Sequence, residues 1–225
     1  WPTITCPNCS MIYVRKAALV SELYENHSWE VSFEKERKRR SKGDLINRLS
    51  QFARFRHKIL PRKTMSRLLD KYCQKNGNVL DIGCGEGKVL DSLNFKFQPF
   101  GIEPSKLQAE ISTDRVKHRG GQIFQGGSLA GLEHFKNMEF EAIVMQSYLE
   151  HEDSPLEVLV NSYRPLNSKG VLIIKVPNYD CFNRLFRGKK WCGYRFPDHL
   201  NYFTPQTLST MVLKSGLKVE NFSYW

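Results

Sequence analysis

A glycine-rich loop that follows an acidic residue is the first feature of this sequence that could do chemistry. The run Val79-Leu80-Asp81-Ile82-Gly83-Cys84-Gly85-Glu86-Gly87 predicts a strand that leads into a loop whose glycines let a ligand approach the backbone. Its G-x-G-x-G spacing differs from the G-x-G-x-x-G fingerprint of dinucleotide sites. Because Asp81 would repel a pyrophosphate and attract a cationic amine, the loop favours a ligand that carries an ammonium group.

A second acid follows at the spacing expected for ribose recognition. The next predicted strand ends in Gly101-Ile102-Glu103-Pro104-Ser105, and Glu103 lies 22 residues after Asp81. A carboxylate at about this separation commonly accepts hydrogen bonds from ribose hydroxyls. The loop and the two acids together predict a site for a nucleoside that carries a cationic amine.

Candidate substrate-binding residues gather in a long, aromatic and basic loop from Asn178 to Thr204. A loop of this length in an enzyme is typical of a lid or a binding element, and we take Trp191, Tyr202 and His199 as pocket candidates. His199 is either a general base or a packed side chain that hydrogen-bonds a backbone carbonyl, and both interpretations stay open. His151 is a second candidate base, although a structural or cofactor-side role is favoured for it.

Two cysteines near the start of the chain have the spacing of a metal-binding knuckle. Cys6-Pro7-Asn8-Cys9 would supply half of a tetrahedral zinc site, but no second pair follows at a suitable distance. A half site for zinc and a redox-inert turn therefore remain as alternatives. The chain begins at Trp1 without an initiator methionine, which suggests a fragment or a processed product.

The elements that must position these residues follow from the alternation of apolar runs. Strands are predicted at 79–82, 100–103, 122–125, 142–145, 171–176 and 218–224, and helices at 88–93, 106–116, 155–163 and 205–215. Two further helices, separated by Pro61, are predicted between residues 44 and 74. This alternation of strands and helices predicts an α/β fold. We expect a Rossmann-like, doubly wound and mostly parallel sheet with helices on both faces. We expect an N-terminal appendage at 1–30, a basic helical lead-in at 31–76 and the ligand-binding domain at 77–225.

Charge and composition limit the choice of partners. The chain has 225 residues and a net charge of +11, and residues 34–67 alone hold 13 basic and three acidic side chains. Such a local run favours a solvated helical face, with a nucleic-acid contact as the less favoured alternative. Neither a membrane-spanning stretch nor a secretory signal is visible, so we expect a cytoplasmic protein with reduced cysteines.

These motifs together resemble the class I S-adenosylmethionine-dependent methyltransferases. The resemblance covers about residues 78–216 and rests on the two motifs above and on two more. These are Phe140-Glu141-Ala142-Ile143-Val144-Met145-Gln146-Ser147-Tyr148-Leu149-Glu150-His151 and Gly170-Val171-Leu172-Ile173-Ile174-Lys175-Val176-Pro177-Asn178. A Trp followed by Pro197-Asp198-His199-Leu200-Asn201-Tyr202-Phe203-Thr204 is similar to one subgroup of this family. Some related enzymes begin with a zinc ribbon, which implies that Cys6 and Cys9 are the remnant of one.

The resemblance implies a role for each motif. Asp81 and the backbone of the glycine loop (Gly83, Cys84, Gly85, Glu86 and Gly87) would hold the methionine part of S-adenosylmethionine. Glu103 and Pro104 would lie at the ribose, Ser128 and Leu129 at the adenine, and Gln146 at the cofactor amine and the transferred methyl.

We therefore expect a methyltransferase that acts on the oxygen or carbon of a small molecule, such as a sugar or a quinone-like metabolite. An RNA-modifying methyltransferase that uses the basic segment and a non-catalytic cofactor-binding protein are the alternatives. The oligomeric state is not predicted.

Overall fold

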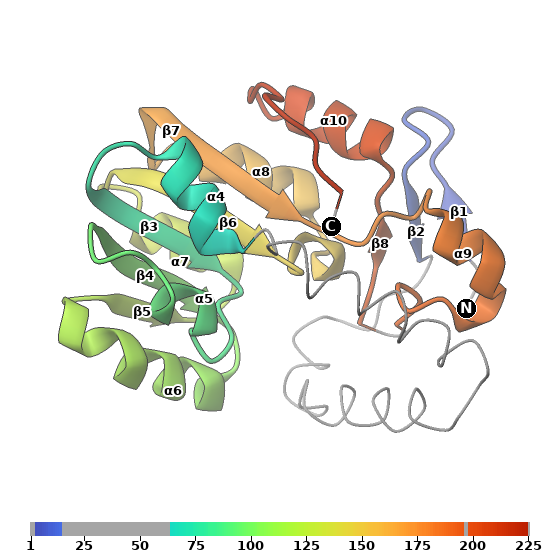
Figure 1. Cartoon of the computed structure of the whole chain (residues 1–225). Coiled ribbons are helices and arrows are strands. Elements are labelled where there is room, and N and C mark those ends of the chain that lie inside the picture. Colours follow the sequence, from blue (N-terminus) through green and yellow to red (C-terminus); the bar gives the residue numbers. More distant parts are fainter. Residues whose placement is uncertain (1–2, 15–63, 196–197, 225) are drawn as a thin grey trace, which may run out of the picture.

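The structure is a computed structural model that describes residues 3–14, 64–195 and 198–224. A parallel five-stranded sheet lies at its centre (Figure 1). Its strands are β3 (Gly77–Ile82), β4 (Phe97–Glu103), β5 (Gln122–Gln125), β6 (Phe140–Gln146) and β7 (Leu166–Lys175), in the order β5-β4-β3-β6-β7. The chain runs outward from β3 to β5 and then returns to β6 beside β3. This reversal creates the switch point at which open α/β sheets bind their ligands.

Helices cover both faces of this sheet (Figure 1). One layer comprises α4 (Met65–Tyr72), α5 (Lys88–Asp91) and α6 (Lys106–Val116), and the other comprises α7 (Ser128–His134), α8 (Pro155–Ser162) and α10 (Pro205–Lys214). The remaining helical segments are η1 (Lys117–Arg119), η2 (Leu149–His151), α9 (Phe182–Arg187) and η3 (Gly188–Lys190).

Alternating side chains on the strands build two separate cores. In β6, Ile143 and Met145 pack with α7 and α8, whereas Ala142 and Val144 pack with α4 and α5 on the opposite face. All four side chains are fully buried. Because successive residues of a strand point to opposite faces, a strand that is covered on both sides is apolar throughout.

Local capping fixes two of the helices that flank the site. The hydroxyl of Ser105 accepts a hydrogen bond from the Gln108 N–H at the start of α6. The hydroxyl of Thr204 and that of Thr207 form a capping box at the start of α10, whose first residue is Pro205. Both helices begin at the residues that the sequence predicts, Lys106 and Pro205.

The N-terminal segment is joined to the main domain by a second, antiparallel sheet. Its strands are β1 (Thr3–Thr5), β2 (Ile12–Val14) and β8 (Asn201–Tyr202), in the order β1-β2-β8. Met11 is only 6% exposed and belongs to the core that includes α8 and α10. Within the expected appendage, residues 3–14 therefore form a hairpin that completes a small sheet, which Figure 1 shows beside α9 and α10.

The predicted elements agree with the structure except at the C-terminal end. The ranges of β5 and α6 match the prediction residue for residue, and α4 confirms the second of the two helices expected before the sheet. The expected strand at 218–224 is wrong, because this segment pairs with no strand among the described residues. Its apolar side chains Val219, Phe222 and Tyr224 are 37–70% exposed, so it has no buried face that could hold it in a sheet.

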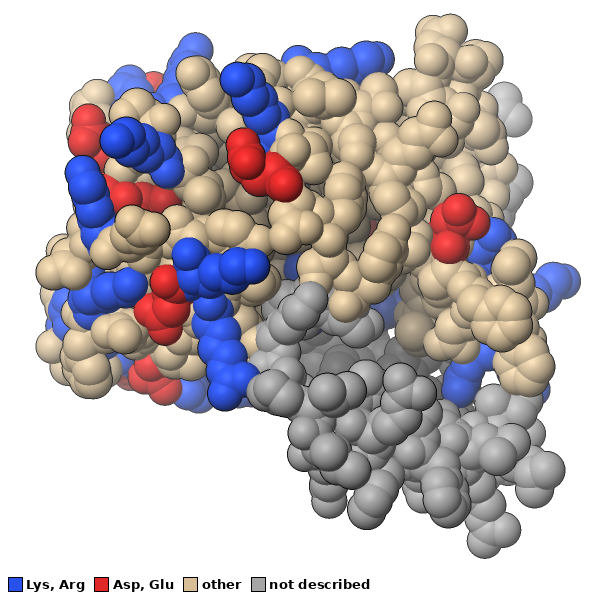
Figure 2. Space-filling view, turned by 45° about the horizontal axis from the view of Figure 1, so that its top comes forward, with Lys and Arg blue, Asp and Glu red and all other residues tan. Residues whose placement is uncertain are grey.

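Several expectations concern residues outside the described ranges. These are the second half of the appendage expected at 1–30, the first helix of the lead-in and almost all of the basic segment at 34–67. On the described surface in Figure 2, basic and acidic side chains are interspersed over the sheet domain, and a large neighbouring area is uncharged. All six cysteines are described and none forms a disulfide, as expected. No helix of the described chain has the length and apolar character needed to cross a membrane.

Candidate functional site

The glycine loop connects β3 with α5 at the carboxyl edge of the large sheet. Gly83, Gly85 and Gly87 have φ angles of 74°, 55° and 75°, a region that residues with a side chain rarely adopt. A Cβ atom on Gly83 would lie 2.0 Å from the ring of Tyr148, which approaches from the segment after β6. Glycine is therefore required at Gly83 both by the backbone and by its neighbour.

Most amide groups of the loop already have partners inside the protein. The Gly83 N–H donates to the Ile102 carbonyl oxygen at 2.8 Å, and the Gly85 N–H donates to the Glu103 carboxylate at 2.8 Å. The Gly87 N–H donates to the Cys84 carbonyl at 2.9 Å. Helix α5 begins at Lys88, as predicted, but it has only four residues. A phosphate cradle needs unpaired amides that point at the ligand. The loop therefore lacks the main feature of a pyrophosphate site.

Asp81 is a buried acid with an unused acceptor. It is 2% exposed, and its Oδ1 has no hydrogen-bond partner in the described structure. Burial, followed by the nearby charge of Glu103, raises the pKa of Asp81 to about 8. A buried polar atom without a partner is destabilising, and a cationic ligand would relieve both the missing contact and the raised pKa.

Glu103 ties the end of β4 to the glycine loop. Its Oε2 accepts the hydrogen bond from Gly85, and its Oε1 accepts one from the Ser105 N–H at 2.9 Å. Burial raises the pKa of this carboxyl, and the two backbone hydrogen bonds oppose the shift. Each carboxylate oxygen accepts two hydrogen bonds, so each retains one acceptor for a hydroxyl of a ligand. Pro104 follows directly, and its carbonyl accepts from Gln125 at the end of β5.

Two other predicted residues, Cys84 and Glu86, have side chains that already interact within the protein. The thiol of Cys84 packs in the core and lies 3.5 Å from the Ser112 hydroxyl of α6. The carboxylate of Glu86 is at the surface and forms an ion pair with Lys88 at 2.7 Å. For both residues, only the backbone is available to a ligand in the loop.

Ser128 and Leu129 belong to the first turn of α7, a helix that was not predicted. The Ser128 hydroxyl donates to the Glu152 carboxylate at 2.7 Å, and Leu129 packs against the core. The side chain of Tyr148 also hydrogen-bonds to Glu152. Glu152 thereby connects Ser128, in the segment after β5, with Tyr148, whose ring packs against Gly83. The sequence analysis missed this residue, although it follows the motif that ends in His151.

The predicted pocket residues Trp191 and Tyr202 are both only 2% exposed. They pack with Tyr179 and Tyr194, and the ring centroids of neighbouring pairs lie 5.3–6.1 Å apart. Tyr179 and Tyr194 are half-buried, and the Tyr194 hydroxyl donates a hydrogen bond to the Tyr179 hydroxyl at 3.3 Å. Tyr179 and Tyr194 are therefore the accessible members of this tyrosine–tryptophan cluster, and Trp191 and Tyr202 lie behind them.

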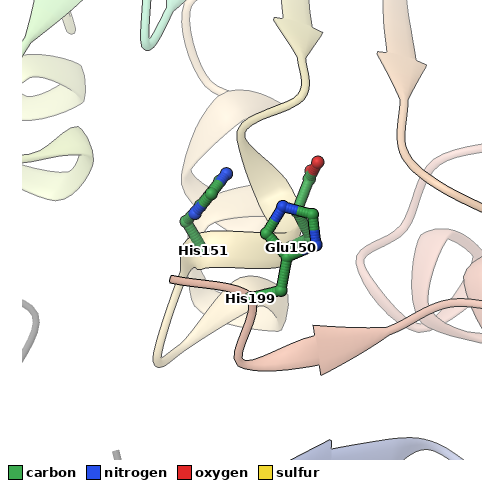
Figure 3. Close-up of side chains that lie close together, drawn as sticks. All are labelled: Glu150, His151 and His199. Carbon is green, nitrogen blue, oxygen red and sulfur yellow. The ribbon is translucent and has the colours of Figure 1, made fainter. Parts of the chain in front are cut away.

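The two candidate bases lie next to each other, although 48 positions separate them in the sequence. After Gln146 ends β6, the chain turns at Ser147, whose φ is 54°, and enters η2 with His151 as its last residue. The His151 and His199 ring centroids are 4.7 Å apart, and the planes are perpendicular. Figure 3 shows both rings and the side chain of Glu150 gathered in one place.

Burial changes the basicity on which the general-base hypothesis rests. It lowers the pKa of His151 to about 4, and burial together with His151 lowers the pKa of His199 well below neutrality. Nδ1 of His199 lies 2.8 Å from the Gly193 carbonyl oxygen, as the packing interpretation predicts. Both imidazoles are therefore neutral at pH 7 and are weak bases in this environment.

Cys6 and Cys9 lie in the turn between β1 and β2. Hydrogen bonds from the backbone of Asn8 and Cys9 lower the pKa of the Cys6 thiol. In the described part of the chain, no further His, Cys or acid gathers with them into a group that could hold a metal. Any zinc site at this hairpin needs ligands from elsewhere, so it remains a prediction.

Comparison with known proteins relates this geometry to one family. A family model for a methyltransferase domain matches residues 52–221. A carboxy-S-adenosyl-L-methionine synthase of Campylobacter jejuni is 29% identical over 135 residues, which are 58% of this chain and 55% of that protein. An uncharacterised protein of Methanocaldococcus jannaschii is 26% identical over 145 residues, covering 63% of this chain and 65% of that one.

Among solved structures, a SAM-dependent methyltransferase of Archaeoglobus fulgidus superposes with a TM-score of 0.53 at 18% identity. The superposition covers 67% of this chain and 65% of that one, and it shows a shared fold. The chain spans 55–65% of the length of these three relatives.

Proposed function

The chain belongs to the methyltransferase-domain family, and from this premise we propose that it transfers a methyl group from S-adenosylmethionine to a small-molecule acceptor. The observation that carries this proposal is the buried Oδ1 atom of Asp81, which has no hydrogen-bond partner in the described structure and lies beside the glycine loop and Glu103. A cationic amino acid joined to a nucleoside fits this set of groups, because it brings an ammonium for Asp81 and ribose hydroxyls for Glu103.

The residues of this chain hold and orient the cofactor. Asp81 pairs with the ammonium group, and Glu103 accepts hydrogen bonds from the ribose with the acceptors that the loop amides leave unused. Gly83 lets the Tyr148 ring pack directly against the glycine loop, which holds the loop in place beside Asp81. When bound, S-adenosylmethionine supplies an electrophilic methyl group on a sulfonium.

The acceptor binds beside the tyrosine–tryptophan cluster. Tyr179 and Tyr194 offer half-buried hydroxyls, and burial raises the pKa of Tyr179, so its phenol remains a hydrogen-bond donor at neutral pH. Their rings present an apolar surface that excludes water from an acceptor. This combination suits an oxygen or carbon nucleophile on a ring-bearing metabolite such as a sugar or a quinone-like compound. Alignment of that nucleophile is the main requirement of the reaction.

The test is turnover with methyl-labelled S-adenosylmethionine on a panel of metabolites, with detection of the labelled product by mass spectrometry. We expect transfer to at least one hydroxylated or carbon-nucleophile acceptor, and loss of transfer in Asp81→Asn. Asp114→Asn is the matched control, because the Asp114 side chain is 75% exposed on α6. Cofactor binding with no product on any acceptor would favour a non-catalytic role.

Two other outcomes would redirect the proposal. The relative in Campylobacter jejuni is named for the synthesis of carboxy-S-adenosyl-L-methionine, so a modified cofactor in the absence of any acceptor would indicate a reaction of that kind. The basic segment at 34–67 supports an RNA substrate instead. Steep salt dependence of RNA binding, lost when Arg37–Arg40 are neutralised, would favour that alternative.

A further inference from the structure

Glu150, His151 and His199 form a buried cluster that the proposed methyl transfer does not require. Glu150 and His151 come from η2, and His199 comes from the segment that leads into β8. Their exposed fractions are 1%, 8% and 4%. One ligand atom from each residue can be chosen so that all three lie within 4.8 Å of one another, and Figure 3 shows the three side chains in one group.

The carboxylate of Glu150 lacks hydrogen bonds. Neither Oε1 nor Oε2 has a partner in the described structure, although the side chain is almost completely buried. A buried carboxylate is costly unless it is paired, hydrogen-bonded or bound to a metal. The charge of Arg195 acts on Glu150, but its effect is smaller than that of burial, so the carboxylate is only partly compensated.

The two imidazoles are oriented as metal-binding histidines are. Nδ1 of His151 lies 2.8 Å from the Asp198 carbonyl oxygen, and Nδ1 of His199 lies 2.8 Å from that of Gly193. A carbonyl oxygen only accepts hydrogen bonds, so each Nδ1 carries the proton and each Nε2 presents a lone pair. Histidines that bind metals commonly donate their second N–H to a carbonyl or a carboxylate in this way.

From this geometry we infer that Glu150, His151 and His199 bind one divalent transition-metal ion, through a carboxylate oxygen and two Nε2 atoms. Two imidazoles with one carboxylate suit Zn²⁺, Fe²⁺, Co²⁺ or Mn²⁺, whereas Mg²⁺ and Ca²⁺ prefer oxygen ligands alone. Metal–ligand bonds of about 2.0–2.2 Å would draw the three atoms closer together than in the metal-free geometry. Three protein ligands leave at least one coordination position for water or another oxygen ligand.

The metal centre would lie between the two parts of the proposed site. Glu150 follows Tyr148, the residue that contacts the glycine loop, and His199 is held by Gly193, which packs against Trp191 of the aromatic cluster. An acceptor oxygen bound to the metal would have a lowered pKa, so it would lose its proton more readily before attack. This role rests on the proposed function, whereas metal binding itself does not.

The experiment is a titration of the whole chain with Co²⁺, followed by its visible absorption, in a Cys6→Ser/Cys9→Ser background that removes the thiol pair. We expect one ion per chain. Affinity should fall roughly tenfold or more in Glu150→Gln and in His199→Asn, and stay unchanged in His118→Asn, which alters an exposed imidazole on η1. Circular dichroism and binding of S-adenosylmethionine check that each variant is folded.

A second measurement needs no variant of the cluster. X-ray absorption of the Zn²⁺-loaded Cys6→Ser/Cys9→Ser protein should show a nitrogen and oxygen shell with imidazole scattering. The inference is overturned by a sulfur shell, by the lack of stoichiometric Co²⁺ and Zn²⁺ binding, or by affinity that Glu150→Gln and His199→Asn leave unchanged. Metal binding without cofactor binding would instead count against the proposed function alone, and cofactor binding without metal would count against this inference alone.

Discussion

Replacing Asp81 by asparagine should make the ligand-free protein more stable at neutral pH and abolish tight cofactor binding. Asparagine keeps the shape of a protonated aspartic acid, but it cannot ionise. Asp81 is fully enclosed and its Oδ1 has no partner in the described structure, so ionisation of this side chain destabilises the fold.

The magnitude follows from the pKa. Burial raises the pKa of Asp81 from 3.8 to about 8, so the native state holds a proton that the unfolded state has released between these values. The free energy of unfolding of the wild type therefore falls as pH rises through this window, by up to about 1.4 kcal/mol per pH unit. Relative to Asp81→Asn, the wild type is less stable by at most about 4 kcal/mol at pH 7. Below pH 4 the difference vanishes.

Chemical denaturation at several pH values between 4 and 9 measures this difference. Other buried acids, such as Glu150, titrate in both proteins. Subtracting one curve of unfolding free energy against pH from the other therefore leaves the contribution of Asp81 ionisation and of its coupling to Glu103. Equal pH slopes for the wild type and Asp81→Asn would refute the account of a buried, unpartnered carboxylate.

The same substitution should act in the opposite direction on cofactor affinity. An ammonium group stabilises the ionised form of Asp81, so binding releases a proton, and the affinity of the wild type rises by up to about tenfold per pH unit between pH 5 and 7. In Asp81→Asn the affinity should be weaker and independent of pH over this range. The proton released on binding is detected by calorimetry in buffers of different ionisation enthalpy, because the measured heat then depends on the buffer. A pH-independent affinity in the wild type would contradict the pairing.

Three further substitutions test the packing and the ribose contact. Gly83→Ala should lower the melting temperature, with a loss of about 1–3 kcal/mol, because its Cβ would lie 2.0 Å from the Tyr148 ring and φ is 74°. Trp191→Ala should cost about 3–5 kcal/mol in a denaturant titration, whereas Phe182→Ala, at an 81% exposed position, should change little. Glu103→Gln should weaken S-adenosylmethionine binding by roughly tenfold or more in calorimetry, since the ribose loses a charged acceptor. An unchanged affinity would show that Glu103 does not bind the ribose.

The sheet and the position of Asp81, the glycine loop and Glu103 at one of its edges could be predicted because their signals are local. Asp81, the glycine spacing and Glu103 lie at the ends of apolar strands, so the parallel order alone brings them to one edge. Helix α6 was predicted residue for residue from its place between two short apolar strands, and the structure adds that Ser105 caps its first turn.

The acceptor side could not be predicted because it depends on contacts between distant segments. The approach of His199 to Glu150 spans 49 positions, and the loss of basicity at both histidines follows from burial that no local pattern encodes. The pairing of β2 with β8 also joins segments that lie far apart in the sequence. At 218–224 the apolar alternation was a misleading signal, since a strand also needs a neighbour and a buried face.

The most direct test of the central claim is a calorimetric titration of the wild-type chain with S-adenosylmethionine, together with its melting temperature in the presence of the cofactor. The account predicts a single site with micromolar affinity, a rise in melting temperature, and loss of both effects in Asp81→Asn but not in Asp114→Asn. No heat and no thermal shift at millimolar cofactor would contradict it.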